Sequence, residues 1–467
     1  MNPVAAQTPT PEYTRELVEF LHRLRPEDLP GEVLDRARYF LLDYLAVTVR
    51  GSREESAQCV QRMIQPVPTG SPANCATVIG TPIRTLPVYA ALANGTASHG
   101  IEHDDTHSGG SIHLGTTMYS AALALAETAP GIATEGFLTA VVAGYEAAAR
   151  LAMALQPKEH YALGFHLTPT CGVFGAAITA CKLLGLSAEQ TLAAVGIAGS
   201  MAAGSMEFLA EGAWTKRIHP GLAARNGMEA AWLAAEGFIG PRRILEGRDG
   251  FLHSYSRNPL PERLTAGLGD SYEILRTAVK PHACCRYMQG PIDAVLELAR
   301  ENGIRPEQIL RIEIAVLEAG WGIVAEPKEP KYDPQSVVDA QFSMPFGAAV
   351  ALICGRAGLD QFTVEQVRSP QVREMMQKVV LVKDPRLEET FPREWPARVS
   401  IQLKDGRGFE RFVRFPKGDP ENPLGWDEMA AKFRSLATAV LSPERCEEVI
   451  RQIATAKPAK LIDLCGA

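Results

Sequence analysis

The sequence GEVLDRARYFLLDYLAVTV, residues 31–49, sets the pattern for the first half of this chain. Its apolar side chains recur every three or four residues, which is the spacing of one face of an α-helix. Pro30 precedes the stretch, and proline suits the start of a helix because its fixed φ matches the first turn. We therefore predict a helix over residues 31–49.

The same helical periodicity continues from residue 13 to about residue 251. Alanine and glycine are frequent in these segments, which favours helices that pack closely and are buried on several faces. Further helices are predicted near residues 87–97, 117–126, 135–154, 171–184, 187–203 and 223–235. Together they indicate a large all-helical domain over residues 1–268.

After about residue 268 the pattern changes to short stretches rich in β-branched residues. Strands are predicted at residues 272–279, 309–317, 378–382 and 397–402, and a Gly-containing turn after the last one predicts a hairpin with residues 409–415. With helices at residues 291–301 and 336–354, residues 269–424 are predicted to form a smaller α+β domain. Helices near residues 426–441 and 443–454 are expected to pack back, so that residues 425–467 complete the helical domain. The predicted fold class is mainly α.

Size and charge limit the classes of partner. A chain of 467 residues is longer than one hydrophobic core usually organises, which agrees with two domains. Its 46% hydrophobic and 22% charged residues are typical of a soluble globular protein. The formal net charge of -7 argues against nucleic acid or an anionic membrane as a partner. An acidic substrate would need a local cationic pocket.

The sequence predicts neither export nor a membrane span. Residues 1–12 lack the basic and apolar regions of a signal peptide, so we expect a flexible tail there. No apolar run is expected to reach the roughly 18 residues of a spanning helix. The nine cysteines include no Cys-x-x-Cys pair, so we expect a reducing cytoplasm, no structural zinc and no cysteine-bound iron–sulfur cluster.

The polar sequence HGIEHDDTH, residues 99–107, followed by His113, is the strongest indication of an active site. Buried imidazoles and carboxylates each need a partner, so such a cluster is costly to keep without a function. On a helix His99 and His103 would share a face, and Asp104, Asp105 and His107 could complete a metal site. Metal-free acid/base chemistry and a hydrogen-bonded helix end are the alternatives.

Three further segments place histidines and cations next to predicted elements. His160-Tyr-Ala-Leu-Gly-Phe-His166 precedes a helix whose N-terminus would favour an anion and lower an imidazole pKa. Lys216-Arg-Ile-His219 could neutralise a carboxylate, or could be a solvated basic turn. Lys280-Pro-His-Ala-Cys-Cys-Arg286 offers two more cations, and we interpret its cysteines as plain thiols.

Together these segments resemble the MmgE/PrpD family over nearly the whole chain. The similar stretches are residues 31–51, 94–113, 164–186, 216–237 and 280–294. The family includes 2-methylcitrate dehydratase, cis-aconitate decarboxylase and iminodisuccinate epimerase. The resemblance implies a homodimer, a lid formed by the smaller α+β domain, and cofactor-free chemistry on di- or tricarboxylates in the cleft between the domains.

The resemblance implies roles for most of the candidate residues, and the chemistry of the side chains adds Asp105, Arg286 and His103. The catalytic residues are expected to be His113 and His166 as acid/base groups, Thr106, and Glu102 with Asp105 to orient the imidazoles. The substrate-binding residues are expected to be Lys216, His219, Lys280, Arg286 and His103. Glu102 stands where the family usually has an aspartate. Cys285 stands where the decarboxylase branch has a histidine, which argues against decarboxylation.

We therefore predict a cytoplasmic, homodimeric, metal-independent lyase that needs no cofactor and dehydrates a 2-methylcitrate-like hydroxy-polycarboxylate. An epimerase of an imino- or amino-dicarboxylate and a cis-aconitate-type decarboxylase are the enzymatic alternatives. All three activities must stabilise a carbanion beside a carboxylate, for which cations and a histidine with a pKa near ambient pH are suited. A binding protein for polycarboxylates is the alternative without catalysis.

Overall fold

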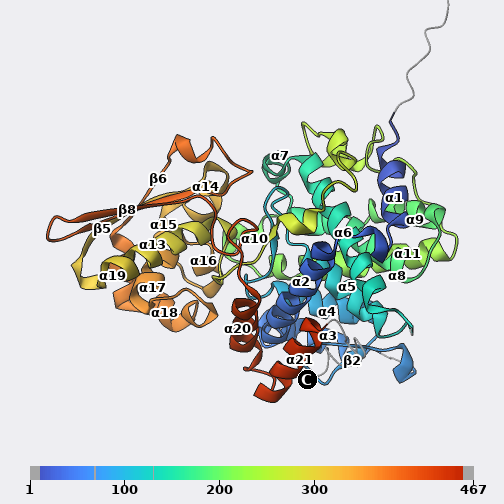
Figure 1. Cartoon of the computed structure of the whole chain (residues 1–467), viewed down its shortest axis with the longest axis horizontal. Helices are drawn as coiled ribbons and strands as arrows, with labels where there is room; N and C mark the ends of the chain where they lie inside the picture. Colours follow the sequence, from blue (N-terminus) through green and yellow to red (C-terminus); the bar gives the residue numbers. More distant parts are fainter. Residues whose placement is uncertain (1–10, 68–69, 130, 456–467) are drawn as a thin grey trace, which may run out of the picture.

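The computed structural model describes residues 11–67, 70–129 and 131–455. Most helices from the first half of the chain gather on one side of the molecule, and the larger sheet lies on the other side with helices of the second half (Figure 1). The predicted mainly α architecture with a smaller α+β domain is confirmed. Of the predicted N-terminal tail, residues 1–10 lie outside the described residues, as do residues 456–467 at the other end.

The centre of the helical side is formed by long helices with small residues at their crossings. These helices are α2 (Gly31–Gly51), α4 (Pro87–His99), α5 (Gly115–Ala126), α6 (Thr134–Leu155), α8 (Leu167–Leu183), α9 (Ala188–Ala198) and α11 (Thr215–Ala235). Where α4 crosses α11, a Cβ atom on Gly95 would lie only 2.5 Å from the Cα atom of Gly221. The close approach therefore requires glycine, as the small-residue pattern predicted.

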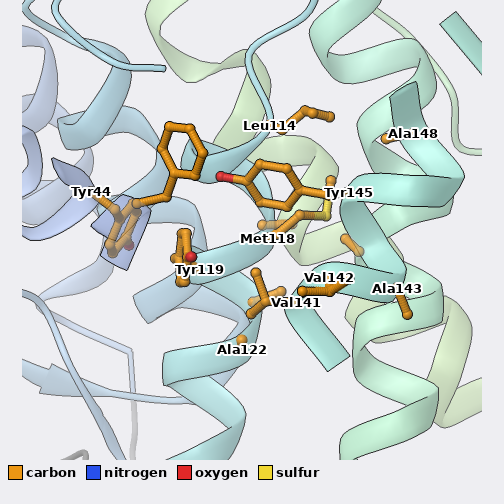
Figure 2. Close-up of a cluster of buried hydrophobic side chains, with 14 of the residues drawn as sticks. Tyr44, Leu114, Met118, Tyr119, Ala122, Val141, Val142, Ala143, Tyr145 and Ala148 are labelled. Atoms are coloured by element: carbon orange, nitrogen blue, oxygen red, sulfur yellow. The ribbon is translucent and has the colours of Figure 1, made fainter. Parts of the chain in front are cut away.

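The packing between α5 and α6 is shown in Figure 2, where Met118 and Tyr119 lie near Val141 and Tyr145. The rings of Tyr119 and Tyr145 meet edge to face with their centroids 6.2 Å apart. Helix α6 is long and apolar enough to cross a membrane, which the sequence analysis did not expect. However, 94% of its most apolar window is buried inside the protein, as in a core helix.

Shorter elements complete the helical side. The helices are α1 (Tyr13–Arg23), α3 (Glu55–Ile64), α7 (Pro157–Ala162), α10 (Phe208–Glu211) and α12 (Phe251–Tyr255). Two-residue strands form two small antiparallel pairs, β1 (Ala76–Thr77) with β2 (Arg84–Thr85) and β3 (Thr106–His107) with β4 (Thr277–Ala278). The second pair joins the histidine-rich segment to the start of the second half of the chain.

The second half of the chain forms a four-stranded sheet in the order β6-β5-β7-β8. Its strands are β5 (Ile309–Ala315), β6 (Val379–Val382), β7 (Ala397–Leu403) and β8 (Gly408–Val413). Strands β5 and β6 are parallel and the other pairs are antiparallel, and the predicted hairpin between β7 and β8 is confirmed. The helices beside it are α13 (Gln289–Asn302), α14 (Glu318–Val324), α15 (Lys328–Tyr332), α16 (Val337–Gln341), α17 (Met344–Cys354), α18 (Val364–Arg368) and α19 (Pro370–Gln377).

Two predicted elements are wrong. The strand expected at residues 272–279 is a 3₁₀ turn, Glu273–Arg276, followed only by β4, because the buried Glu273 turns to bond the helical side. The single helix expected at residues 336–354 is split into α16 and α17. Ser343 separates them, since its side chain accepts a hydrogen bond from the N–H of Phe346 and so caps α17.

The chain returns to the helical side at its end. Helices α20 (Trp426–Ala437) and α21 (Pro443–Ala454) lie beside α2, and Phe433 and Ile450 join the core of that side. Ile274 and Val279 still belong to this core, whereas Ala283 belongs to the core of the second half. We propose that residues 1–268 with 425–467 and residues 269–424 act as two units, in which Ile274 and Val279 of the second unit still pack on the core of the first.

Candidate active site

The histidine-rich segment leaves α4 at His99 and runs as a loop to the start of α5. His103 is therefore not on the helix, and the shared helical face considered for His99 and His103 does not form. Glu102 and Ser111 both adopt left-handed backbone conformations, with φ of 56° and 48°. Such non-glycine residues cost of order 1 kcal/mol and are found where surrounding structure holds them for a function. Both residues line a buried cavity.

Glu102 is held between two lysines that come from different parts of the chain. Lys216, in the first turn of α11, pairs with one carboxylate oxygen of Glu102. Lys280, which follows β4, lies 3.4 Å from the other oxygen and 3.2 Å from the Glu102 carbonyl oxygen. Burial would raise the pKa of Glu102, but the two ammonium groups outweigh it and hold that pKa below its usual range. Glu102 is therefore ionised and faces two cations.

Asp104 lies between two imidazole rings. One oxygen of its carboxylate, Oδ2, lies 2.8 Å from Nδ1 of His99 and 3.0 Å from Nδ1 of His113. Burial would raise the pKa of Asp104, but His113 and His99 outweigh it and keep the pKa well below the usual range. Burial lowers the pKa of His99 to about 4 and also lowers that of His113. These pKa shifts agree with neutral His99 and His113 rings that each donate their Nδ1–H to the ionised carboxylate of Asp104.

His166 and His219 form a second imidazole pair. His166 occupies the N-cap position of α8, as predicted, and its Nδ1 lies 3.1 Å from Nδ1 of His219 in the first turns of α11. Burial holds the pKa of His166 well below its usual value and lowers that of His219 to about 4. The His166 ring is also stacked on the His99 ring at 6.0 Å, so the two pairs form one cluster.

The cavity lies where the two halves of the chain meet and has a volume of about 50 Å³. The helical side contributes Glu102, Thr106, Ser111, Tyr161 and the two histidines His113 and His166, and the second half contributes Cys285, Arg286, Tyr287, Ile323 and Phe342. A groove of about 1000 Å³ adjoins it, because Ser111, Tyr161 and Tyr287 line both spaces. A small molecule could therefore reach the cavity through this groove.

Most of the predicted site residues meet around this cavity. The lining includes Glu102, Thr106, His113, His166, Lys216, Lys280 and Arg286. Lys216 and His219 lie within α11 and not in a solvated turn before it. Lys216 and Lys280 come from different parts of the chain and both pair with the carboxylate of Glu102.

Three predicted residues lie elsewhere. The Asp105 carboxylate accepts hydrogen bonds from Tyr145 and from the N–H of Gly115, so it caps α5 and does not orient an imidazole. Burial raises the pKa of Asp105 to about 7. His219 lies behind His166 and does not line the cavity. His103 is buried, its carbonyl oxygen accepts a hydrogen bond from Lys432, and it is not among the residues that line the cavity.

The fold also brings to the site residues that were not predicted to be catalytic or substrate-binding. Asp104 orients the imidazoles in place of Asp105, and its five-residue spacing from His99 was a usable signal. Tyr161 lies between the two histidines of a motif already singled out. Phe342, whose ring lies 5.3 Å from the Lys216 ammonium, comes from the distant α16–α17 junction, and no local pattern marked it.

Possible metal ligands also gather in this cluster. His99, Asp104 and His113 each offer a ligand atom, and these atoms lie within 4.8 Å of one another. Their geometry is already that of hydrogen bonds from two ring N–H groups to one carboxylate oxygen. The Lys280 ammonium lies 3.7 Å from the other oxygen of Asp104, and a cation bound here would be repelled by it. The donor set therefore fits hydrogen bonding better than metal binding.

Comparisons with known proteins agree with this arrangement. Residues 15–264 match the MmgE/PrpD N-terminal domain and residues 282–456 match the MmgE/PrpD C-terminal domain. The cis-aconitate decarboxylase-like protein oryM of Aspergillus oryzae is 31% identical, over 96% of this chain and 95% of its own length. The cis-aconitate decarboxylases of Aspergillus terreus and Mus musculus are 28% and 30% identical, over 93% and 94% of this chain and 91% and 89% of their own lengths. The chain belongs to the MmgE/PrpD family and is an enzyme of its lyase type.

Proposed function

We propose that this protein is a cofactor- and metal-independent lyase that acts on a small di- or tricarboxylate. The observation that carries the proposal is the Lys216–Glu102–Lys280 arrangement, in which two buried ammonium groups share one carboxylate at the cavity. Lys216, Lys280 and Arg286 place three cationic side chains at the cavity of a chain whose net charge is -7, and a polyanion needs such groups to bind. Buried cations of this kind also stabilise the negative charge that develops on a carboxylate when the carbon beside it becomes a carbanion.

The proton transfers are assigned to the histidines. His113 is held at Nδ1 by Asp104 and by the carbonyl oxygen of Asp105 at 2.8 Å, which leaves its Nε2 for a bound substrate. Because burial lowers the pKa of His113, the ring is neutral near pH 7 and suited to accept a proton. His166 is the second acid/base group. Thr106 lies 3.3 Å from Nδ1 of His113 and helps to fix that ring.

Decarboxylation of a cis-aconitate-like substrate is the first candidate reaction, because the relatives above carry that name over nearly the whole chain. In this reaction the bond between a carboxyl group and its carbon breaks and CO₂ leaves. The electron pair passes into the neighbouring double bond, and a carbon atom takes a proton. The lysines would hold the remaining carboxylates, and one of the cavity histidines would supply the proton.

Dehydration of a 2-methylcitrate-like substrate is the second candidate, and Cys285 favours it. This residue lines the cavity at the position where the family resemblance associates a histidine with decarboxylation. Burial raises the pKa of the Cys285 thiol, so it stays neutral and is a weaker proton donor than an imidazolium. In dehydration a neutral histidine takes a proton from carbon, and the electron pair of the broken C–H bond forms the double bond. The imidazolium formed in this way protonates the hydroxyl group, which leaves as water.

Incubation with cis-aconitate, 2-methylcitrate and smaller dicarboxylates in deuterated water distinguishes these reactions. Release of CO₂ identifies the decarboxylase, and an unsaturated product without CO₂ identifies the dehydratase. Deuterium incorporation without loss of either group identifies an epimerase. Binding of the polycarboxylates without any turnover, measured by calorimetry, would contradict the lyase and leave a binding protein.

A homodimer and a cytoplasmic location are further parts of the proposal. The family resemblance implies the homodimer, and the cysteines, which include no Cys-x-x-Cys pair, favour the cytoplasm. Light scattering of the purified protein tests the dimer. Fractionation of the source cells tests the location.

A further inference from the structure

Lys432, on helix α20 near the end of the chain, has its ammonium group buried behind the active site. Its Nζ lies 2.6 Å from Oδ1 of Asp43, 2.7 Å from the carbonyl oxygen of His103 and 3.0 Å from the carbonyl oxygen of Lys280. An ammonium group has three N–H donors, so these three acceptors satisfy it completely. A buried, paired charge of this kind is expensive to maintain, and its partners indicate what it holds.

The two carbonyl partners belong to the segments that carry the active-site charges. His103 lies between Glu102 and Asp104, and the side chain of Lys280 pairs with that of Glu102. The side chains of Lys280 and Glu102 already join these two segments. The ammonium of Lys432 joins the same segments a second time, through hydrogen bonds to their backbones. Glu102 also has a left-handed backbone, which needs such support from its neighbours.

We propose that Lys432 is a positioning residue that fixes the Glu102 and Lys280 segments relative to each other and so sets the geometry of the proposed polycarboxylate site. Asp43, on α2, is its counter-ion and connects this tether to the helical core. Lys432 is not among the residues that line the cavity. The kinetic part of this inference rests on the proposed lyase function, whereas the tether itself does not.

The sequence alone gives a weak signal for this role. Lys432 lies in an amphipathic helix far from every polar motif, where a lysine is ordinarily solvated. Its function becomes visible only because α20 returns to α2 and brings the side chain against the loop after α4.

The test uses Lys432→Met in the full-length protein, together with the charge-balanced variant Asp43→Asn/Lys432→Met. The double variant removes the tether without leaving the Asp43 carboxylate buried and unpaired. A lower kcat in this variant can therefore be attributed to displaced active-site segments and not to unfolding. Lys182→Met is the matched control. Lys182 also donates three hydrogen bonds to backbone carbonyls, those of Leu21, His22 and Leu24, but it caps α1 away from the cavity.

Two readouts are expected to agree. Hydrogen–deuterium exchange of the amides of residues 100–107 and 278–284 should speed up in both Lys432 variants and stay unchanged in Lys182→Met. With the substrate that the wild-type protein turns over, kcat should fall by about 10- to 100-fold in the Lys432 variants, because a displacement of about 1 Å in a site costs on the order of 10²-fold. The control should keep its kcat even though it loses stability.

Unchanged kcat in the charge-balanced variant would overturn the positioning role, whatever happens to its melting temperature. Unchanged exchange in both segments would overturn the tether. If the wild-type protein turns over none of the carboxylates, the proposed function fails, and the exchange measurement still decides whether Lys432 holds the two segments together.

Discussion

The carboxylate of Asp104 lies 3.0 Å from Nδ1 of His113 and fixes that ring by one of its two nitrogens. The same oxygen also accepts from His99, so a single ionised group orients two imidazoles. Because the carboxylate only accepts hydrogen bonds, both rings must carry their proton on Nδ1. The tautomer of His113 that has a free lone pair on Nε2 is therefore selected by Asp104 together with the carbonyl oxygen of Asp105, which lies 2.8 Å from the same Nδ1.

Replacement of Asp104 by Asn should lower kcat by about 10²- to 10⁴-fold, the range typical of a lost acid/base function. The amide keeps the shape of the carboxylate, but it has lost the charge and presents N–H groups on one side. The negative charge that stabilises a protonated His113 is then gone, and one of the two rings can face an N–H group in place of an acceptor. The measurement is steady-state kinetics together with a thermal melt, and an Asp104→Asn protein that folds and keeps its kcat would contradict the assignment.

His113→Ala and His166→Ala should each lower kcat by about 10²- to 10⁴-fold. The matched control is His253→Ala, because His253 is exposed on α12 and far from the cavity lining. Since burial lowers the pKa of His113, the wild-type kcat should decline on the acid side only below the ordinary histidine pKa of about 6.5. Near-normal turnover in both variants would place the proton transfer on other groups.

The general architecture and most of the cavity could be predicted because their signals are local. Helical periodicity located α2, α6 and α8, and the alternation of β7 and β8 with a Gly-containing turn located the hairpin. The motifs around His113, His166, Lys216 and Lys280 carried the family pattern, and they converge on one cavity.

The missed features depend on contacts between distant segments. Tyr272 and its neighbours have the composition of a strand, but the hydrogen bonds of Glu273 to Glu146 and His107 fold them into a turn. Asp105 was expected to face an imidazole, yet capping of α5 and the Tyr145 hydroxyl turn it the other way. Only the packed fold decides which of two adjacent aspartates faces the histidines.

His160 offers a test of pH-dependent stability outside the catalytic groups. Its Nδ1 lies 2.8 Å from the carbonyl oxygen of Tyr255 and its Nε2 lies 2.9 Å from the Thr170 hydroxyl. Burial lowers its pKa to about 4. Between pH 6.5 and pH 4 the ring is protonated in the unfolded chain and neutral in the folded one, so its contribution is fully present above pH 6.5 and is lost as the pH falls.

At pH 5 the contribution of His160 to the free energy of unfolding should be about 2 kcal/mol smaller than above pH 6.5. The measurement is the free energy of unfolding in urea for the wild type and for His160→Gln, which keeps an amide capable of both hydrogen bonds but does not titrate. The advantage of the wild type over this variant should shrink between pH 7 and pH 5. Parallel pH profiles would show that His160 is not held neutral.

Removal of metal ions should leave activity intact. Asp104 already accepts hydrogen bonds from His99 and His113, and the ammonium of Lys280 is 3.7 Å from its other oxygen. The measurement is dialysis against a strong chelator, followed by elemental analysis and an activity assay. Stoichiometric zinc, iron or manganese whose removal abolishes turnover and whose return restores it would refute the metal-independent mechanism.

Lys216→Met and Lys280→Met should each lower kcat/KM by about 30-fold or more, the effect of about 2 kcal/mol expected when one partner of a buried charge pair is lost. The two side chains are only 7% and 1% exposed, so the loss should change little with salt. Lys158→Met is the control, because Lys158 is exposed on α7 and lines the groove but not the cavity. Any effect of this exposed charge on kcat/KM should fade as salt is added. The double variant Glu102→Gln/Lys216→Met keeps the charge balanced and guards against simple unfolding. If it folds and still binds polycarboxylates as tightly as the wild type, Lys216 does not hold the substrate.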